Sequence, residues 1–405
     1  MRRSGGAAIH MKNLDVKYMA GGPIQNVSPL PPYDERVCTF LAELSKMLQK
    51  DCQAAVYPDV LSFAFFCRKA NITKLKQEFE DGRCRIGKGM AFHIAPANVP
   101  VNCAFTYAFG LLAGNANVVR VPSKAFRQVE IICKILEEMF ASGGYDVIRD
   151  MTAFVSYGHN KEVNDVLSAM ADVRIVWGGN ETISQIRQSP ITPRCTEIVF
   201  ADRYSFGLLS PEAVADAGED EVKRLAEQFY NDTYLMDQNA CSSPHLIIWL
   251  SNGGEKAAIG KGRFWSAVFQ TAGKYDLADI KVSDKYVMLC KYAIDLECIQ
   301  EIQRFENLLY VATLKALPED ITGLRGRFGL FFQYDVRVLE ELAEHIDETV
   351  QTCVCYGIDR AAVRKFVLDN GLKGIDRIVP IGSSLDIGVI WDGYDIIGQM
   401  SRIIG

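Results

Sequence analysis

Residues 89–124 read GMAFHIAPANVPVNCAFTYAFGLLAGNANVVRVPSK, and this stretch decides the fold. Its first part, residues 89–96, predicts a buried strand that ends at a Pro-Ala-Asn-Val-Pro turn. Residues 101–112 are small or apolar almost throughout, which favours a buried helix. Residues 117–121 predict a second strand, ended by Pro-Ser-Lys. A strand, a helix and a strand at this spacing form a βαβ unit, so a parallel sheet is expected.

The alternation continues after this unit. Helices and strands are predicted in turn at residues 126–140, 151–156, 160–171, 173–177 and 181–188, and helices precede the unit at 36–49 and 62–67. This order is typical of a doubly wound nucleotide-binding domain, which we expect to occupy residues 1–200. The first ten or so residues have the composition of a flexible leader.

A second domain is expected at residues 201–373. It begins with a helix predicted at 219–234, followed by strands at 245–250, 286–289 and 308–314 and a helix near 336–346. Residues 374–405 predict extended segments and turns, which we expect to pack back on the first domain or to form an oligomer interface. The expected fold class is therefore α/β, with two domains that each hold a mainly parallel sheet flanked by helices.

Composition excludes several classes of protein. The chain has 405 residues, 49% of them hydrophobic, which is ample for two cores. Its formal charge of −6 and the absence of a basic stripe argue against nucleic acid as a partner. We find no secretory signal and no run of about 20 apolar residues that would span a membrane. The 12 cysteines are scattered without a CxxC pair, so we expect a reduced, cytoplasmic protein.

One close pair of cysteines exists, Cys353-Val354-Cys355. A CxC pair without nearby partners is a weak metal signal, so no metal is expected.

Two strand-to-helix turns in the first domain have the character of phosphate sites. They are Pro122-Ser123-Lys124 and Gly178-Gly179-Asn180. Glycine lets a backbone approach an anion, and a helix N-terminus supplies N–H groups and a positive dipole end. The G-x-G-x-x-G fingerprint is absent, and most paired glycines after a strand are plain turns.

Cys241 lies in Met236-Asp237-Gln238-Asn239-Ala240-Cys241-Ser242-Ser243-Pro244, between a predicted helix and a predicted strand. A thiol there is held rigidly and can face a cleft, as a covalent nucleophile requires. On this fragment alone an inert buried thiol is the better interpretation, because free cysteine is among the most buried residue types.

The order of these features resembles the aldehyde dehydrogenase superfamily. Four segments carry the resemblance: Ile94-Ala95-Pro96-Ala97-Asn98-Val99-Pro100, Leu112-Ala113-Gly114-Asn115-Ala116-Asn117-Val118-Val119, Trp177-Gly178-Gly179-Asn180-Glu181 and Gln238-x-x-Cys241. Within it the chain looks closest to the acyl-CoA reductases, the group containing the fatty-acid reductase of bacterial bioluminescence. Asp237 to Pro244, Asp376 to Gly382 and Trp391-Asp392-Gly393-Tyr394-Asp395 indicate that group, and the match spans roughly residues 85–400.

The resemblance implies a chemistry for Cys241. Its thiolate would attack an acyl-CoA, CoA would leave, and a thioester on Cys241 would be reduced by hydride to an aldehyde. Asn98 would donate its amide to the oxyanion, with the Cys241 backbone N–H as the second donor. The alternative is that Asn98 only provides hydrogen bonds within the turn between two prolines.

The resemblance also implies a nicotinamide cofactor, bound by Pro96, Gly178, Gly179 and residues after the 117–121 strand. Relatives that prefer NAD have a glutamate where this chain has Lys124. A lysine attracts a 2′-phosphate, so NADPH is expected, held by Ser123 and Lys124 with Arg120 or Arg127 as helpers. A solvated lysine is the alternative.

Glu306 resembles the glutamate that holds the nicotinamide ribose in the superfamily, although a solvated glutamate fits the sequence equally well. Glu197 lies near the place of the dehydrogenase base, but its flanking residues do not fit that role. A reductase should exclude water from its acyl-enzyme and needs no such base. His245 falls on a predicted strand, which favours a structural histidine.

Other functions stay open at this point. The chain could be a CoA-acylating or hydrolytic aldehyde dehydrogenase, a phospho-acyl reductase of the glutamyl-phosphate type, or a non-catalytic interaction subunit with the same fold. The resemblance implies an acyl-transferring partner enzyme, and homo-oligomers are common in the superfamily. Residues 81–90 are short for the usual oligomerisation hairpin.

Overall fold

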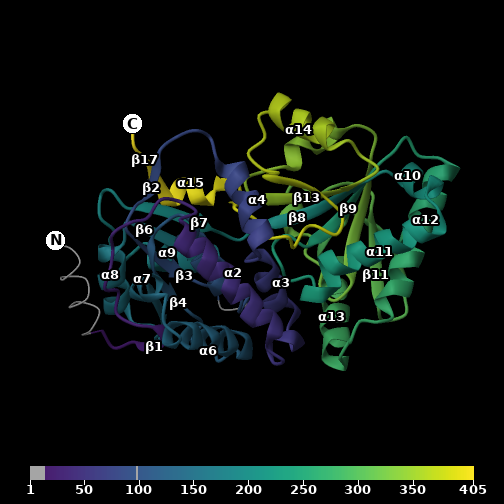
Figure 1. Ribbon diagram of the computed structural model, residues 1–405. Coiled ribbons are helices and arrows are strands. Elements are labelled where there is room, and N and C mark those ends of the chain that lie inside the picture. The colour runs from purple at the N-terminus through teal and green to yellow at the C-terminus, as the bar shows by residue number, and fades with distance from the viewer. Residues whose placement is uncertain (1–13, 97–98) are drawn as a thin grey trace. The chain divides into compact units, whose positions relative to one another are not determined.

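The computed structural model describes residues 14–96 and 99–405. The chain divides into two compact units. The first consists of the residues up to Ala201 together with Gly388–Gly405, and the second is Asp202–Ile387. Both units consist of a sheet with helices on its faces (Figure 1).

The first unit is built on a six-stranded sheet in the order β1-β5-β4-β3-β6-β7. Its strands are β1 (Lys17–Gly21), β3 (Met90–Ile94), β4 (Ala116–Arg120), β5 (Thr152–Ser156), β6 (Val173–Trp177) and β7 (Thr196–Phe200). Only β1 runs antiparallel to its neighbour. The βαβ unit expected at residues 89–124 is β3, α5 and β4, and these two strands pair in parallel as predicted.

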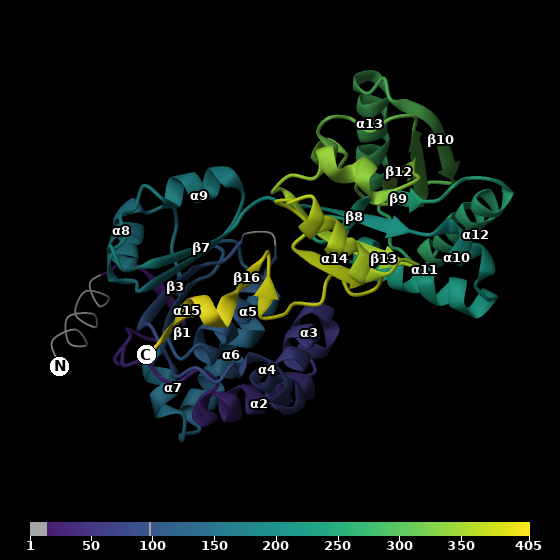
Figure 2. The ribbon, with the colours of Figure 1, turned by 90° about the horizontal axis from the view of Figure 1, so that it is seen from above.

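Helices cover both faces of this sheet. They are α2 (Glu35–Lys50), α3 (Pro58–Phe66), α4 (Lys69–Phe79), α5 (Asn102–Leu112), α6 (Arg127–Ala141), α7 (Asp146–Asp150), α8 (Lys161–Met170) and α9 (Asn180–Ile186), with a 3-10 turn at Ala54–Val56. Figure 2 shows α8 and α9 on one side of the sheet and α2 with α6 on the other. Every residue of α5 is buried, which explains why its sequence is mostly apolar and carries no charge.

The end of the chain returns to the first unit. A two-stranded hairpin, β15 (Ile390–Trp391) and β16 (Tyr394–Asp395), leads into α15 (Ile396–Met400). The last strand, β17 (Ser401–Ile403), pairs with β2 (Arg85–Gly87). Figure 2 shows the yellow α15 among the blue elements of this unit, next to α5.

The second unit holds a seven-stranded sheet in the order β10-β11-β12-β9-β8-β13-β14. Its elements are β8 (Tyr204–Leu209), α10 (Pro211–Asp216), α11 (Glu219–Thr233), η2 (Tyr234–Met236), β9 (Pro244–Leu250), α12 (Glu255–Ala272), α13 (Asp279–Asp295), β10 (Ile299–Phe305), β11 (Leu309–Leu314), η3 (Ile321–Gly323), β12 (Leu330–Val336), η4 (Leu339–His345), β13 (Val350–Tyr356), α14 (Arg360–Asp369) and β14 (Arg377–Pro380). Only β10 is antiparallel to its neighbour. One core packs α11 and α12 on the sheet, and the opposite core includes α14. The expected α/β class with two mainly parallel sheets is thus confirmed.

Three local predictions differ from the structure. Residues 286–289, expected as a strand, lie inside helix α13, which buries only Lys285 and Leu289 and so lacks a helical apolar stripe. The helix expected near 336–346 is a 3-10 helix after the end of β12. The chain rejoins the first unit at Gly388 rather than at 374, because β14 pairs with β13.

Among the described residues, no helix is long and apolar enough to cross a membrane.

Candidate active site

The first unit brings its predicted cofactor residues to one edge of the sheet. β3, β4 and β6 are parallel neighbours, so Pro96, the 122–124 turn and the 178–179 turn all follow their carboxyl ends. The strand order reverses at β3, because β4 and β5 lie on one side of it and β6 and β7 on the other. Ligands of open α/β sheets bind outside the carboxyl ends at such a switch point.

The turn after β4 presents its polar residues to solvent. Ser123 and Lys124 are exposed, and the Lys124 ammonium lies 5.2 Å from the centroid of the Phe126 ring. The two arginines already have partners in the protein. Arg127 forms an ion pair with Glu130 at 2.8 Å, and the Arg120 guanidinium lies 4.6 Å from the Tyr157 ring.

The turn after β6 leaves room for an anion. A Cβ on Gly179 would meet no atom within 4 Å, so the backbone is open on that side. Gly179 is the N-cap of α9, and no side chain caps the helix there. Its first N–H groups are therefore available to an oxygen ligand, which fits a dinucleotide phosphate.

In the second unit, the Cys241 turn (residues 234–243) joins α11 to β9. Asp237 and Gln238 have φ values of 54° and 58°, the left-handed region that non-glycine residues rarely adopt. The buried Gln238 amide donates to the Leu330 carbonyl at 3.1 Å and accepts from the Gly329 N–H at 2.8 Å. It thereby fastens the turn to the start of β12.

The thiol itself is at the surface of this unit. Cys241 is exposed, whereas Ser242 and Ser243 are buried. The Ser205 hydroxyl donates to the Cys241 carbonyl at 2.7 Å, and the Ser243 hydroxyl donates to the Asp232 carbonyl at 2.7 Å. The backbone on both sides of the sulfur is thus anchored, and Cys241 is not the buried thiol that its sequence fragment alone favours.

A buried carboxylate fixes a further loop beside this turn. Asp232 accepts from the Gly382 N–H at 2.6 Å and from the Ser384 N–H at 2.9 Å. Burial raises the pKa of Asp232 to about 6, against the effect of these two hydrogen bonds. The residues singled out near 376–382 are therefore attached to the helix that leads to Cys241.

Glu306 lies in the turn between β10 and β11 and is exposed, with a φ of 50°. It lines a surface hollow with Arg304 and Asn307. This position leaves its carboxylate accessible, as a ribose ligand would require.

Two other residues have structural roles. Glu197 accepts hydrogen bonds from Arg174 and from Arg187, and although burial acts to raise its pKa, these two guanidinium groups lower it overall. His245 is buried and bonded to the Gly326 carbonyl, and burial lowers its pKa to about 3. Neither group is placed to act as a general base at neutral pH.

Asn98 lies outside the described residues, so its predicted oxyanion role stays a prediction.

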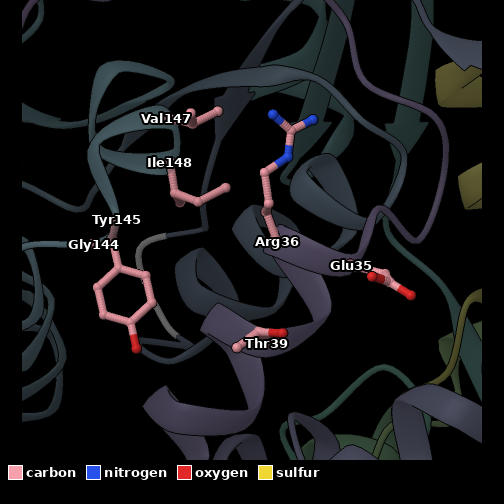
Figure 3. Close-up of a pocket in the computed structure, with 7 residues that line it drawn as sticks. All are labelled: Glu35, Arg36, Thr39, Gly144, Tyr145, Val147 and Ile148. Carbon is pink, nitrogen blue, oxygen red and sulfur yellow. The ribbon is translucent and has the colours of Figure 1, made fainter.

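Figure 3 shows a pocket of the first unit that lies away from the predicted cofactor residues. Its residues come from the first turns of α2, from Gly144 and Tyr145 before α7, and from Val147 and Ile148 within α7 (Figure 3). Residues 144–148 precede β5, so this pocket lies toward the amino end of that strand. The predicted cofactor residues follow carboxyl ends, and the pocket is not part of their site.

Comparison with solved structures defines the class of fold. The chain is similar to a 1-pyrroline-5-carboxylate dehydrogenase from Thermus with bound NAD, with a TM-score of 0.63, 13% identity and coverage of 93% of this chain and 81% of that one. It is also similar to an NAD-dependent benzaldehyde dehydrogenase from Corynebacterium glutamicum, with a TM-score of 0.60, 14% identity and coverage of 99% and 88%. The fold is that of the aldehyde dehydrogenases.

Sequence comparison then gives the family. The acyl-CoA reductase (LuxC) family matches residues 10–259, and the chain belongs to this family. Membership makes the protein an oxidoreductase and implies an acyl-CoA substrate. A comparison with curated protein sequences found no match.

Proposed function

We propose that this protein reduces an acyl-CoA, with a fatty acyl group as the expected cargo, to the aldehyde by way of a thioester on Cys241, and that it uses NADPH. The observation that carries the proposal is the exposed Cys241 on a strained, anchored turn of a chain that belongs to the acyl-CoA reductase family. Strained backbone persists where the surrounding structure holds it, and it concentrates at functional sites.

The first step is a transfer of the acyl group. The Cys241 sulfur, as thiolate, attacks the thioester carbon, the bond from carbon to the CoA sulfur breaks, and CoA leaves as its thiolate. Asn98 and the Cys241 backbone N–H are the proposed donors to the oxyanion. The product is an acyl group on Cys241, which keeps the electrophilic carbonyl of a thioester.

The second step is a reduction. NADPH, when bound, would supply the hydride for this carbonyl carbon. The Cys241 thiohemiacetal that results then collapses, which releases the aldehyde and the free thiol. Ser123 and Lys124 would hold the 2′-phosphate, Gly178 and Gly179 the pyrophosphate, and Glu306 the nicotinamide ribose, with Pro96 and Arg120 beside the cofactor.

The environment of Glu197 supports the reductive direction over a hydrolytic one. A hydrolytic aldehyde dehydrogenase needs a carboxylate that activates water, whereas Glu197 is paired with Arg174 and Arg187. A low pKa makes that carboxylate a poor base for water. An acyl group on Cys241 would therefore persist until it is reduced.

Mass spectrometry of the intact protein tests the proposal. Incubation with acyl-CoAs of different chain lengths and no cofactor should add one acyl group, and NADPH should then remove it as aldehyde. Cys241→Ala should abolish the adduct, and Cys52→Ala, which removes another exposed thiol, should leave it unchanged. Absence of the adduct from the unmodified protein, or its persistence in Cys241→Ala, would contradict the proposal.

A further inference from the structure

Helix α13 carries a lysine whose side chain is completely buried. The exposure of Lys285 is 0%, and its Nζ donates to the carbonyls of Asn307 and Phe328, the latter at 2.8 Å. The ammonium also lies 4.5 Å from the centroid of the Tyr310 ring. Burial, together with the nearby Arg304 guanidinium, lowers the pKa of Lys285 to about 7. Burying an amine in this way is costly, so the contacts it makes require an explanation.

The two carbonyls belong to two separate turns. Asn307 is in the Glu306 turn (residues 306–308), between β10 and β11. Phe328 is in the Phe328 turn (residues 326–329), which leads into β12. Lys285 is thus the point at which these two turns meet α13.

Both turns are also bonded to the Cys241 turn. The Tyr234 hydroxyl donates to the Leu308 carbonyl at 3.1 Å. The Gln238 amide bonds the backbone of Gly329 and Leu330. The three turns therefore form one hydrogen-bonded cluster.

A second lysine of α13 reinforces the cluster. Lys281, one helical turn before Lys285, forms an ion pair with Asp237 at 2.8 Å. The Tyr275 hydroxyl donates to the same carboxylate. Helix α13 thereby contacts all three turns through two lysines that lie on one face.

Backbone strain concentrates in this cluster. Seven non-glycine residues have a positive φ in the described part of the chain, and four of them lie in the three turns: Asp237, Gln238, Glu306 and Phe328. Such conformations are unfavourable for non-glycine residues and persist only where neighbouring groups hold them. The carbonyl bonds of Lys285 are suited to hold two of the turns at once.

We propose that Lys285 is a positioning residue for the reaction, which holds the Cys241 turn and the Glu306 turn in a fixed relation to each other. This inference rests on the proposed function, because it takes Cys241 as the acyl carrier and Glu306 as a cofactor ligand. Lys285 contacts neither reacting group. It acts through the carbonyls of Asn307 and Phe328.

The test compares Lys285→Met with Lys291→Met, which alters an exposed lysine of the same helix. Lys285→Met leaves two carbonyls unpaired, so it should slow acylation of Cys241 by about tenfold and raise the KM for NADPH by about threefold or more. Lys291→Met should change neither quantity. A purely structural role would lower stability without this joint effect on the two half-reactions.

Tyr234→Phe is a second variant that weakens the same cluster, because it removes the hydrogen bond to the Leu308 carbonyl with little change of side-chain shape. It should slow acylation and raise the KM for NADPH, each by more than about twofold but by less than Lys285→Met does, and it serves if Lys285→Met does not fold. Near-normal acylation and KM, both within about twofold of the unmodified protein, in a folded Lys285→Met or in Tyr234→Phe would overturn the inference.

Hydrogen exchange separates this inference from the proposed function. Loss of the lysine should speed exchange of the Gln238 and Gly329 amides, whatever reaction the protein catalyses. If the unmodified protein is not acylated at all, the proposed function fails. Unchanged exchange at these amides would overturn the positioning role by itself.

Discussion

Gln238 shows how one side chain can shape a functional turn. Its amide donates to one backbone carbonyl of the β12 start and accepts from one N–H there, as a strand partner would. Two bonds of this kind compensate for a left-handed backbone at Gln238 itself. Cys241 follows three residues later and is exposed.

Lys124 provides a test of cofactor choice at the residue scale. Lys124→Glu places a carboxylate beside the expected 2′-phosphate, and repulsion should lower the ratio of kcat/KM for NADPH to that for NADH by about tenfold or more. Steady-state kinetics with both cofactors checks this. Lys134→Glu, at an exposed site on α6, should leave the ratio unchanged. A clear preference of the unmodified protein for NADH would refute the assignment.

Asp232 predicts a pH dependence of stability. Its pKa is raised to about 6 in the folded protein, so the folded state binds its proton more tightly than the unfolded state does. Its unfavourable contribution to the free energy of unfolding is absent below about pH 4. This contribution grows as the pH rises and reaches about 3 kcal/mol near pH 6.

The difference in free energy of unfolding between the unmodified protein and Asp232→Asn isolates this effect. The unmodified protein should lose stability relative to the variant between about pH 4 and 6 and hold a constant difference above that range. Denaturant titrations across this range measure the difference. A flat difference would show that burial does not perturb this carboxyl.

The role of a residue could be predicted from the sequence only where its reactive or binding groups lie within one short motif. Cys241 and the two glycines after β6 belong to short segments that the sequence presents together. Lys285 gives no such signal, because its meaning depends on Asn307 and Phe328, which converge on it only after folding. Long-range convergence of turns cannot be inferred from spacing along the chain.

At the scale of elements, α5 depends on close packing at Gly110. A Cβ there would lie 1.7 Å from Asn117 Oδ1 and 2.9 Å from His93 Nε2. Asn117 donates its amide to the Asn115 carbonyl, so its Oδ1 faces His93 Nε2, and the neutral ring donates from that nitrogen. Burial lowers the pKa of His93 to about 4, which keeps the ring neutral at physiological pH.

Gly110→Ala should therefore lower the free energy of unfolding by about 3 kcal/mol, because the helix and β4 cannot both keep their places. Gly262→Ala is the matched control, since Gly262 lies in α12 and a Cβ there meets no atom within 4 Å. That change should be neutral or stabilise by up to about 1 kcal/mol, through helix propensity. Equal effects of the two substitutions in chemical denaturation would contradict the packing argument.

Elements with a strong period were predictable, and those without one were not. Strands β3, β4, β5 and β6 and helix α11 lie where the sequence predicts them, whereas β1 and β7 were not predicted. Helix α13 was missed because its buried face consists of Lys285 and Leu289 alone, while Ile280, Val287 and Ile294 are exposed. Helix α13 is attached to the three neighbouring turns by hydrogen bonds from its lysines, and such bonds leave no apolar pattern in the sequence.

At the scale of the whole molecule, the first unit depends on residues 388–405. β17 pairs with β2, Asn115 donates its amide to the Met400 carbonyl at 2.9 Å, and Tyr394 packs edge-on against Phe200. A protein that ends at Ile387 loses all of these contacts. Its α5 and β2 should exchange amide hydrogens much faster, while β9 in the second unit stays protected.

Hydrogen exchange followed by mass spectrometry measures this difference. A protein that ends at Ile404, and so lacks only Gly405, serves as the control and should match the full chain. Unchanged protection of α5 after the larger deletion would mean that the first unit is complete without its last segment.

The first unit consists of two separate segments of the chain, and this sets the order in which the two units are synthesised. Residues 202–387 are contiguous, so every strand of the second sheet is made before α15 and β17. The first unit is begun earlier but gains β17 and α15 only after the whole of that sheet has been made. The first unit is thus begun before the second and completed after it, whereas domains of multidomain proteins usually form in order from the amino end.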